Sequence, residues 1–404
     1  MKFKFNNLIS PLLKILIIIS FLIFCYYFSL KVEGTGDEHL FLNDLKFLKL
    51  NNWFEAISKK MAIAYLILAY PISFIIKDYL ALRLVNVLLF LLLLLYCRKI
   101  GEIKNKMFYF YFLFYSSNGW FLLGTNDTLF IVSLFIFFNE VYKFLENKKN
   151  TSIPLLWCSL IVAFFTRELV YVYIPVIIIS FVLLINAKVN LLNKIAIPIG
   201  LLGLFFLINS PSIITNHSFS YDNKKPPVGV KSNWAQRQYL AQLMVNDGKL
   251  NDEQHPSWQE TDDYLLKNGK NSLPSTISEG VLFDFKLTVK EFFKDFSKVI
   301  LQSIRQTGLI VIILIMFLMY NVLKNKIETN LYIPFILFLM IAIFSFIIIS
   351  FVEIRWLTPL FIIALVYYSD LESNKKINKN IFLLNNLMTI LVLFYGLYRV
   401  MHKL

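Results

Sequence analysis

Residues 79–97 read YLALRLVNVLLFLLLLLYC, and residues 98–106, which follow directly, read RKIGEIKNK. The first segment is long and apolar enough to cross a bilayer as a helix. The second carries four basic residues and one acidic residue, and short basic loops stay on the cytoplasmic side of a membrane. Together the two segments predict a transmembrane helix that ends at the cytoplasmic face.

The same alternation of apolar runs and basic loops extends along most of the chain. We interpret ten further runs as spans: 11–30, 107–125, 128–142, 153–166, 169–186, 195–210, 308–323, 331–350, 356–369 and 381–398. Four further hydrophilic segments with an excess of basic residues are 143–150, 187–194, 324–330 and 371–380. The expected fold class is an all-α polytopic membrane protein with about eleven transmembrane helices.

The composition excludes several other classes. Of the 404 residues, 57% are hydrophobic and 16% are charged, whereas a soluble domain carries about 25% charged residues. The formal net charge of +14 fits basic cytoplasmic loops in such a chain, so it does not indicate a nucleic-acid partner. The three cysteines all lie in apolar runs and have no disulfide or zinc-site spacing.

The apolar run 61–76 is predicted not to cross the membrane. If it crossed, and the N-terminus lies in the cytoplasm, all five basic loops would lie outside, against the charge rule; if it does not cross, all five lie inside. It is also short, because 16 residues of helix rise about 24 Å, less than the roughly 30 Å hydrocarbon core. We therefore expect a helix or hairpin that dips in from the outer face.

This topology divides the chain into three parts. Residues 1–210 form an N-terminal transmembrane module with a first outer loop at 31–78, residues 211–306 form a large periplasmic loop, and residues 307–404 form the C-terminal helices. The large loop is expected to hold helices near 232–245 and 283–304. The expected location is the inner, cytoplasmic membrane, with the candidate site facing the periplasm.

The first outer loop opens with Gly34-Thr35-Gly36-Asp37-Glu38-His39. Two adjacent carboxylates lie a few residues beyond the first span, at the outer membrane surface. A carboxylate in a partly dry interface can act as a general base, and it can also hold a divalent cation. The alternative is structural, because Asp37 or Thr35 could cap a helix over residues 40–50.

Five short motifs resemble the polyprenyl-phosphate-dependent glycosyltransferases of the GT-C fold, in particular the relatives of protein mannosyltransferases and aminoarabinose transferases. The motifs are the Asp37-Glu38 doublet, residues 59–66, the Arg-Leu start of residues 83–87, the acidic turn at 124–127 and the Arg-aromatic start of residues 355–359. The likeness covers about residues 10–190 and 330–370. Met61 stands where the family has a proline, and the loop 211–306 has no counterpart.

The resemblance implies a site and a reaction. Asp37 and Glu38 are the expected catalytic residues, with Asp37 as the base. Arg355, Arg167 and Lys60 are expected to bind the donor phosphate. Asp127 is expected to orient the acceptor or to complete a metal site with Asp37, occupied by Mg²⁺ or Mn²⁺.

The expected donor is a sugar on a polyprenyl phosphate, and the reaction inverts the anomeric carbon. No nucleotide is expected, because the chain has no glycine-rich phosphate loop. The expected acceptor is a hydroxyl of a glycolipid, a glycan or a protein at the outer face of the membrane, and the lipid bilayer is the other expected partner.

Each assignment has a structural alternative. Arg167 could pair with Glu168, Arg355 could pair with Glu353, and Lys60 could be an ordinary interfacial cation. Two other functions also stay open at this point: a surface-polysaccharide polymerase or ligase, and a transporter of lipid or solute. Transporters often show inverted repeats and broken helices near mid-membrane, and no repeat is visible in this sequence.

Overall fold

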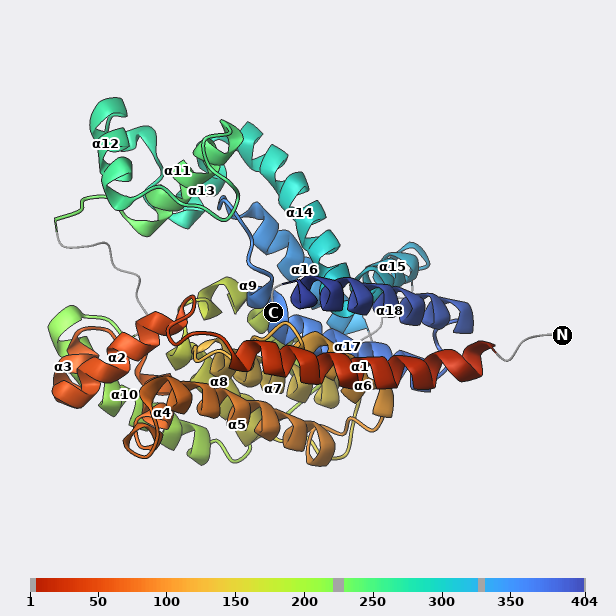
Figure 1. Ribbon diagram of the computed structural model, residues 1–404. Helices are drawn as coiled ribbons and strands as arrows, with labels where there is room; N and C mark the ends of the chain where they lie inside the picture. The colour runs from red at the N-terminus through yellow and green to blue at the C-terminus, as the bar shows by residue number, and fades with distance from the viewer. Residues whose placement is uncertain (1–4, 221–228, 326–330, 403–404) are drawn as a thin grey trace. The chain divides into compact units, whose positions relative to one another are not determined.

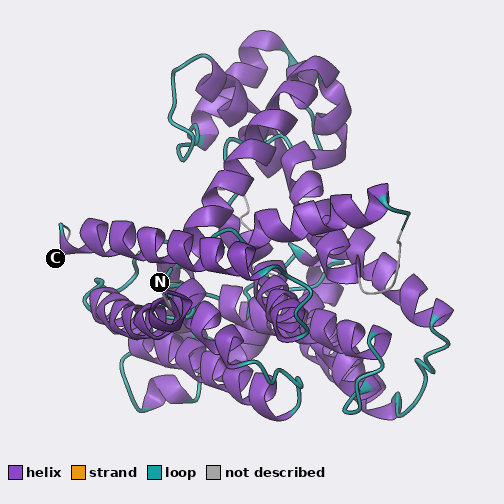
Figure 2. Ribbon diagram, turned by 90° about the vertical axis from the view of Figure 1, so that its right-hand side faces the viewer, coloured by secondary structure: helices purple, strands orange, loops and turns teal. Residues whose placement is uncertain are grey.

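The computed structural model describes residues 5–220, 229–325 and 331–402, and over these ranges the chain is all-helical, with no strand (Figure 2). Six of the described helices are long and apolar enough to cross a membrane, and four shorter apolar helices accompany them. The expectation of an all-α, multi-pass membrane protein is confirmed at this level.

The chain divides into two compact units. The larger unit comprises Met1–Asp222, Ser303–Leu337 and Thr358–Leu404, and the smaller unit comprises Asn223–Gln302 and Phe338–Leu357. Figure 1 follows the order of the helices through both units.

The helices of the N-terminal half are α1 (Phe5–Ser29), α2 (Glu38–Leu50), α3 (Trp53–Ser58), α4 (Ile63–Ala69), η1 (Ile72–Phe74), α5 (Asp78–Lys99), α6 (Lys106–Ser116), α7 (Asp127–Leu145), α8 (Ile153–Thr166), α9 (Val170–Asn186) and α10 (Ala196–Asn216). The remaining helices are α11 (Trp234–Asn246), α12 (Trp258–Asn268), η2 (Lys270–Ser272), α13 (Ile277–Phe283), α14 (Phe285–Thr307), α15 (Ile310–Leu323), α16 (Tyr332–Phe346), η4 (Ile354–Leu357), α17 (Thr358–Ser373) and α18 (Lys379–Met401).

Ten of the eleven predicted spans coincide with one of the ten apolar helices. The exception is the run 107–125, where α6 ends at Ser116 after 11 residues. The chain turns there, and Gly119 adopts a left-handed φ of 87°, which favours glycine. A helix of this length rises about 16 Å and cannot cross a bilayer by itself, so the prediction of a continuous spanning helix at 107–125 was wrong.

The segment 61–76 forms two short helices and no span. α4 has seven residues, and a turn at Pro71 leads from it into η1. Seven helical residues rise about 10 Å, a third of the hydrocarbon core. The chain on both sides of the segment lies at the same end of the larger unit, because Arg83 at the start of α5 donates to the backbone carbonyl of Lys31, just beyond α1.

Two of the predicted basic loops contact the C-terminal end of α17, at the other end of the larger unit. Asn105 donates to the backbone carbonyl of Ser369 (2.8 Å), and Lys148 pairs with Asp370 (2.8 Å). The segments 98–106 and 143–150 thus both adjoin the start of the segment 371–380. The central helix α7 is nearly all buried and packs against α5, α8, α9 and α17, while α1 packs against α6 and α18.

The smaller unit contains α11 and α14 at the places predicted for helices in the large loop. Its core is formed by Tyr239, Leu240, Leu273 and Ile348. The long helix α14 packs Phe292 in a stacked geometry on Phe346 of α16, with ring centroids 4.2 Å apart.

Candidate functional site

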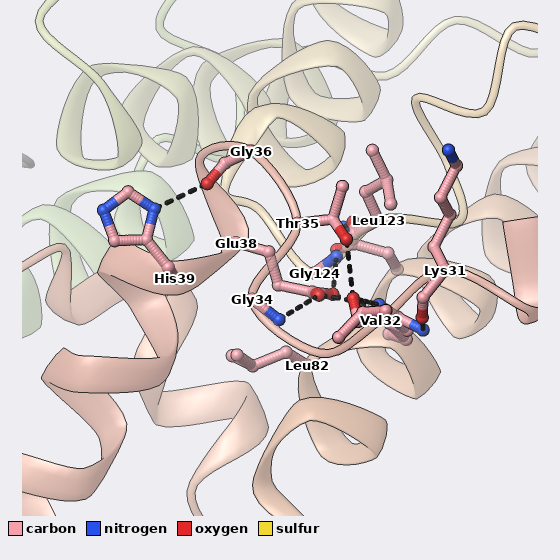
Figure 3. Close-up of polar contacts among 12 residues, drawn as sticks. Lys31, Val32, Gly34, Thr35, Gly36, Glu38, His39, Leu82, Leu123 and Gly124 are labelled. Carbon is pink, nitrogen blue, oxygen red and sulfur yellow. Dashed lines mark hydrogen bonds and ion pairs between the residues drawn. The ribbon is translucent and has the colours of Figure 1, made fainter.

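Glu38 is fully buried at the start of α2, and Arg83 of α5 binds both of its carboxylate oxygens. Arg83 Nε donates to Oε1 and Nη2 donates to Oε2, each at 2.7 Å. The backbone N–H groups of Gly34 (3.0 Å) and Gly124 (2.9 Å) also donate to this carboxylate, as Figure 3 shows. A buried charge is tolerated when it is paired and hydrogen-bonded in this way. We call Glu38, Arg83, Gly34 and Gly124 the Glu38 cluster.

The Glu38 cluster joins three segments that are distant in sequence. Arg83 also donates to the backbone carbonyls of Lys31 and Val32, each at 3.0 Å. The chain just beyond α1, the first turns of α5 and the loop before α7 are therefore held together by one guanidinium and one carboxylate.

Gly124 is required by close packing in this cluster. A Cβ atom built there would lie 2.5 Å from Cβ of Leu82 and 2.9 Å from Oε1 of Glu38. Both distances are too short for a side chain, so glycine allows the loop before α7 to approach the carboxylate.

Asp37 precedes Glu38 at the N-cap position of α2 and is partly exposed. Its side chain makes no capping hydrogen bond to the first turn, and its backbone is in the right-handed helical region. Thr35 donates its hydroxyl to the carbonyl of Val32 (2.6 Å) and lies two residues before the N-cap position of α2. The capping role considered for the two residues is therefore not realised in the structure. Glu38 is rigidly held, and Asp37 is partly exposed.

Asp127 and Arg167 form an ion pair at the same end of the larger unit. Asp127 is the first residue of α7 and is 5% exposed, and the Thr125 hydroxyl donates to its Oδ2 (3.3 Å). The side chain of Asn126 donates to the carbonyl of Thr166, at the end of α8 (3.1 Å). The segment 124–127 thus connects the Glu38 cluster to the Asp127–Arg167 pair.

Lys60 lies in the turn after α3 with a left-handed φ of 61°, and its N–H donates to the carbonyl of Ile57 (2.9 Å). Its neighbour Lys59 places its ammonium over the ring of Phe47, 3.9 Å from the ring centroid. Both lysines belong to the segment between α1 and α5.

Arg355 lies in η4 of the smaller unit, where its guanidinium binds the carboxylate of Glu353. The other predicted site residues belong to the larger unit. The ion pair anticipated as a structural alternative for Arg355 is present.

Within the described ranges, no group of three or more His, Cys, Asp and Glu side chains is arranged to hold a metal ion. Asp127, one of the two proposed ligands, is already engaged by Arg167. The donor set fits a divalent cation poorly, and no chemical step below depends on one.

Sequence reasoning missed the role of Gly124 and the partner of Arg83. In the sequence Gly124 is only the first residue of the acidic turn 124–127, and Arg83 is only the start of the motif 83–87. The available signal was a lone arginine in an otherwise apolar run, because a cation at membrane depth needs a partner.

Comparison of the chain with protein-family models, with curated proteins and with solved structures found no match.

Proposed function

We propose that the chain is an integral membrane glycosyltransferase that moves a sugar from a polyprenyl-phosphate donor to an acceptor hydroxyl at the outer face of the membrane. The observation that carries the proposal is the position of two adjacent carboxylates a short loop beyond the first membrane helix. Glu38 is buried and bound by Arg83, and Asp37 beside it is partly exposed.

A general base needs a carboxylate with a fixed backbone and an accessible oxygen. The Glu38 cluster supplies the first, since it fixes the residue next to Asp37 through four hydrogen bonds to one carboxylate. Partial exposure supplies the second. In the proposed step the carboxylate of Asp37 takes the proton of the acceptor hydroxyl.

The bond changes are those of a single displacement. The acceptor oxygen attacks the anomeric carbon, the bond from that carbon to the phosphate oxygen breaks, and the bond electrons leave with the lipid phosphate. Attack opposite to the leaving group inverts the configuration. In this proposal the departing phosphate is neutralised by Arg167 and Lys60 of the larger unit, because guanidinium and ammonium groups bind phosphate through charge-assisted hydrogen bonds. Arg355 of the smaller unit is a separate candidate for phosphate binding.

The pairing of Asp127 with Arg167 supports a shared role for the two residues. In the proposal Asp127 holds the Arg167 guanidinium in place and presents its remaining acceptor capacity to the incoming hydroxyl. The pair lies at the end of the larger unit that also carries Asp37.

The test of the proposed function is donor consumption by the purified protein. Candidate polyprenyl-phosphate sugars are supplied with and without a hydroxyl acceptor, and release of the free polyprenyl phosphate is measured. Acceptor-dependent release of the lipid phosphate supports the proposal. The absence of release across hexose and pentose donors, with a folded protein in the same lipid, contradicts it.

The proposed orientation is tested separately. Single cysteines replace Asn51 and Lys267, which we expect outside, and Lys104 and Lys148, which we expect inside, in a chain whose three native cysteines are replaced by alanine. An impermeant thiol reagent added to intact cells should label only the first two positions. Labelling at 104 without labelling at 267 contradicts the orientation.

A further inference from the structure

An open pocket of about 470 Å³ lies in the larger unit, between α2, η1 and the N-terminal end of α5. Its polar lining residues are Glu33, Lys46, Lys49, Ser73, Lys77 and Asp78. We call it the lysine pocket. It has no place in the reaction proposed above, and none of the residues that line it was predicted as a site residue.

The charges of the lysine pocket are only partly compensated. Lys49 donates to Asp78 (2.5 Å) and to the carbonyl of Ser73 (2.6 Å), so its ammonium is neutralised within the protein. Lys46 and Lys77 are exposed and make no ion pair within the described residues. With Glu33 as the remaining acid, the pocket has an excess of one positive charge.

The pocket adjoins surface that suits a bilayer. Phe74 and Ile75 are 66% and 84% exposed in the turn at η1. Phe74 continues an aromatic ladder from Trp53 through Tyr70, with ring centroids 5.0 and 4.9 Å apart. Aromatic side chains gather in this way at the membrane–water interface.

The outward face of α5 continues from the pocket as an apolar stripe. Exposed leucines recur at intervals of three or four residues along this helix: Leu80, Leu84, Leu88, Leu91 and Leu95. That spacing places them on one side of a helix. The first of them lies one residue beyond Tyr79, which lines the pocket.

We propose that the lysine pocket binds the phosphate headgroup of an anionic phospholipid, with the acyl chains lying along the leucine stripe of α5. A lipid phosphate between Lys46 and Lys77 gains two charge-assisted contacts, and it lies at the positive end of the 22-residue helix dipole. The charged headgroup thus lies in a basic pocket at the start of α5, and the acyl chains lie on the apolar surface along the same helix. The inference rests on the membrane character of the chain and is independent of the proposed glycosyl transfer.

The test measures binding of phosphatidylglycerol to the delipidated protein in detergent by native mass spectrometry, with phosphatidylcholine as the uncharged reference. The variant is the double substitution Lys46→Gln and Lys77→Gln. The matched control is Lys99→Gln and Lys104→Gln, which removes the same charge from exposed lysines near the opposite end of α5. The pocket variant is expected to bind phosphatidylglycerol roughly 10- to 30-fold more weakly, and the control variant is expected to bind as the natural chain does.

A second variant changes affinity in the opposite direction. Glu33→Gln removes the uncompensated acid of the pocket, and it is expected to tighten phosphatidylglycerol binding several-fold while leaving phosphatidylcholine binding unchanged. A folding defect would weaken phosphatidylglycerol binding, so it cannot explain tighter binding in this variant.

Four outcomes overturn the proposal. Equal losses in the pocket and control variants indicate general surface charge, and equal binding of the two phospholipids indicates chain contacts alone. Displacement of phosphatidylglycerol by millimolar inorganic phosphate indicates a free-phosphate site. If the pocket variant loses polyprenyl phosphate and keeps phosphatidylglycerol, the pocket belongs to the lipid donor.

Discussion

Arg83 and Glu38 are 45 positions apart in sequence and bind one another through two parallel hydrogen bonds of 2.7 Å. Glu38 is fully buried and Arg83 is 9% exposed. A bidentate pair of this kind fixes both position and angle, so it determines where the adjacent Asp37 enters α2. Glu38 was expected to be catalytic together with Asp37, and in the proposal it acts by holding Asp37 in position through this ion pair.

Removing one partner of this pair is expected to destabilise the fold. Glu38→Gln keeps the shape of the side chain but leaves the Arg83 guanidinium buried without a counter-charge. The expected loss is about 3–5 kcal/mol, the usual cost of breaking a buried pair, measured as a lower melting temperature in detergent.

The matched control for Glu38→Gln is Asp247→Asn. This change breaks the exposed Lys249–Asp247 pair (2.8 Å), and exposed pairs are worth about 0–1 kcal/mol. Similar melting temperatures for the two variants would mean that the Glu38 cluster contributes little to stability.

A methyl group at position 124 is expected to disturb the same cluster sterically. Gly124→Ala forces a Cβ atom against Leu82 and the Glu38 carboxylate, and overpacking of this kind costs about 1–3 kcal/mol. Gly200→Ala is the control, because nothing lies within 4 Å of a Cβ at that position of α10. In the control, alanine should be neutral or should stabilise the helix by up to about 1 kcal/mol. Equal melting temperatures for both variants contradict the close-packing argument.

The sequence predicts the large features of this fold because they follow from periodicity and charge. The loop charge count and the length of the run 61–76 are enough to predict that this segment does not cross, and α4 has only seven residues there. The early end of α6 was not predicted, because Phe121 and its neighbours are as apolar as a span although the chain has left the helix. Hydropathy does not distinguish residues buried in protein from residues facing lipid.

The sequence indicates which residues form the candidate site, but it does not indicate which of them form ion pairs with one another. Asp37, Asp127 and Arg167 were all expected at one face, and the structure brings Asp127 and Arg167 into contact. The partner of Arg83 could not be derived, since nothing in the sequence links a residue of α5 to one 45 positions earlier. Pairing over that sequence separation depends on tertiary packing, which a local sequence pattern does not predict.

Arg355 and Glu353 should affect donor binding in different ways. In the proposal Arg355 binds the donor phosphate, so Arg355→Ala is expected to weaken donor binding by about 2–3 kcal/mol. Arg355→Lys should recover only part of the loss, because lysine cannot form the bidentate fork. Glu353→Gln frees the guanidinium from its present partner and should leave donor affinity unchanged or raise it.

The measurement for these variants is equilibrium binding of the polyprenyl-phosphate donor, with melting temperature as the folding control. An Arg355→Ala variant that binds donor normally removes this residue from the proposed site. Equal weakening by Glu353→Gln would mean that the ion pair acts as a structural unit.

Asp295 of α14 is expected to make the stability of the smaller unit depend on pH. Burial, reinforced by the nearby carboxylate of Glu291, raises the pKa of Asp295 to about 7, while Lys298 and Lys294 oppose this shift and Asp252 adds to it. An unfolded aspartate titrates near 4. Between these values the folded state binds more protons at Asp295, so the contribution of this residue to stability is greatest near pH 4 and decreases as the pH rises to about 7.

Asp295→Asn removes this charge and is expected to raise stability at pH 8 by on the order of 1–3 kcal/mol, with little change near pH 4. Melting curves of both proteins from pH 4 to pH 8 test the expectation. The exposed Asp263→Asn is the control and should leave the pH profile unchanged. Parallel pH profiles of the Asp295→Asn variant and the natural chain would contradict the assignment.

Asp37→Asn is expected to abolish most turnover without loss of stability. Asparagine has the same shape and is as good as aspartate at an N-cap position, and the Asp37 side chain makes no capping bond that could be lost. Loss of a general base lowers the rate by roughly 10²–10⁴.

The measurement is turnover at saturating donor. The control is Glu55→Gln, which changes an exposed carboxylate in the same segment between α1 and α5 and should keep full activity. Glu38→Gln should instead lose stability, so the two adjacent carboxylates are separable by experiment. If Asp37→Asn melts normally and turns over at the natural rate, the base lies elsewhere, and Asp127, already placed by Arg167, becomes the next residue to test.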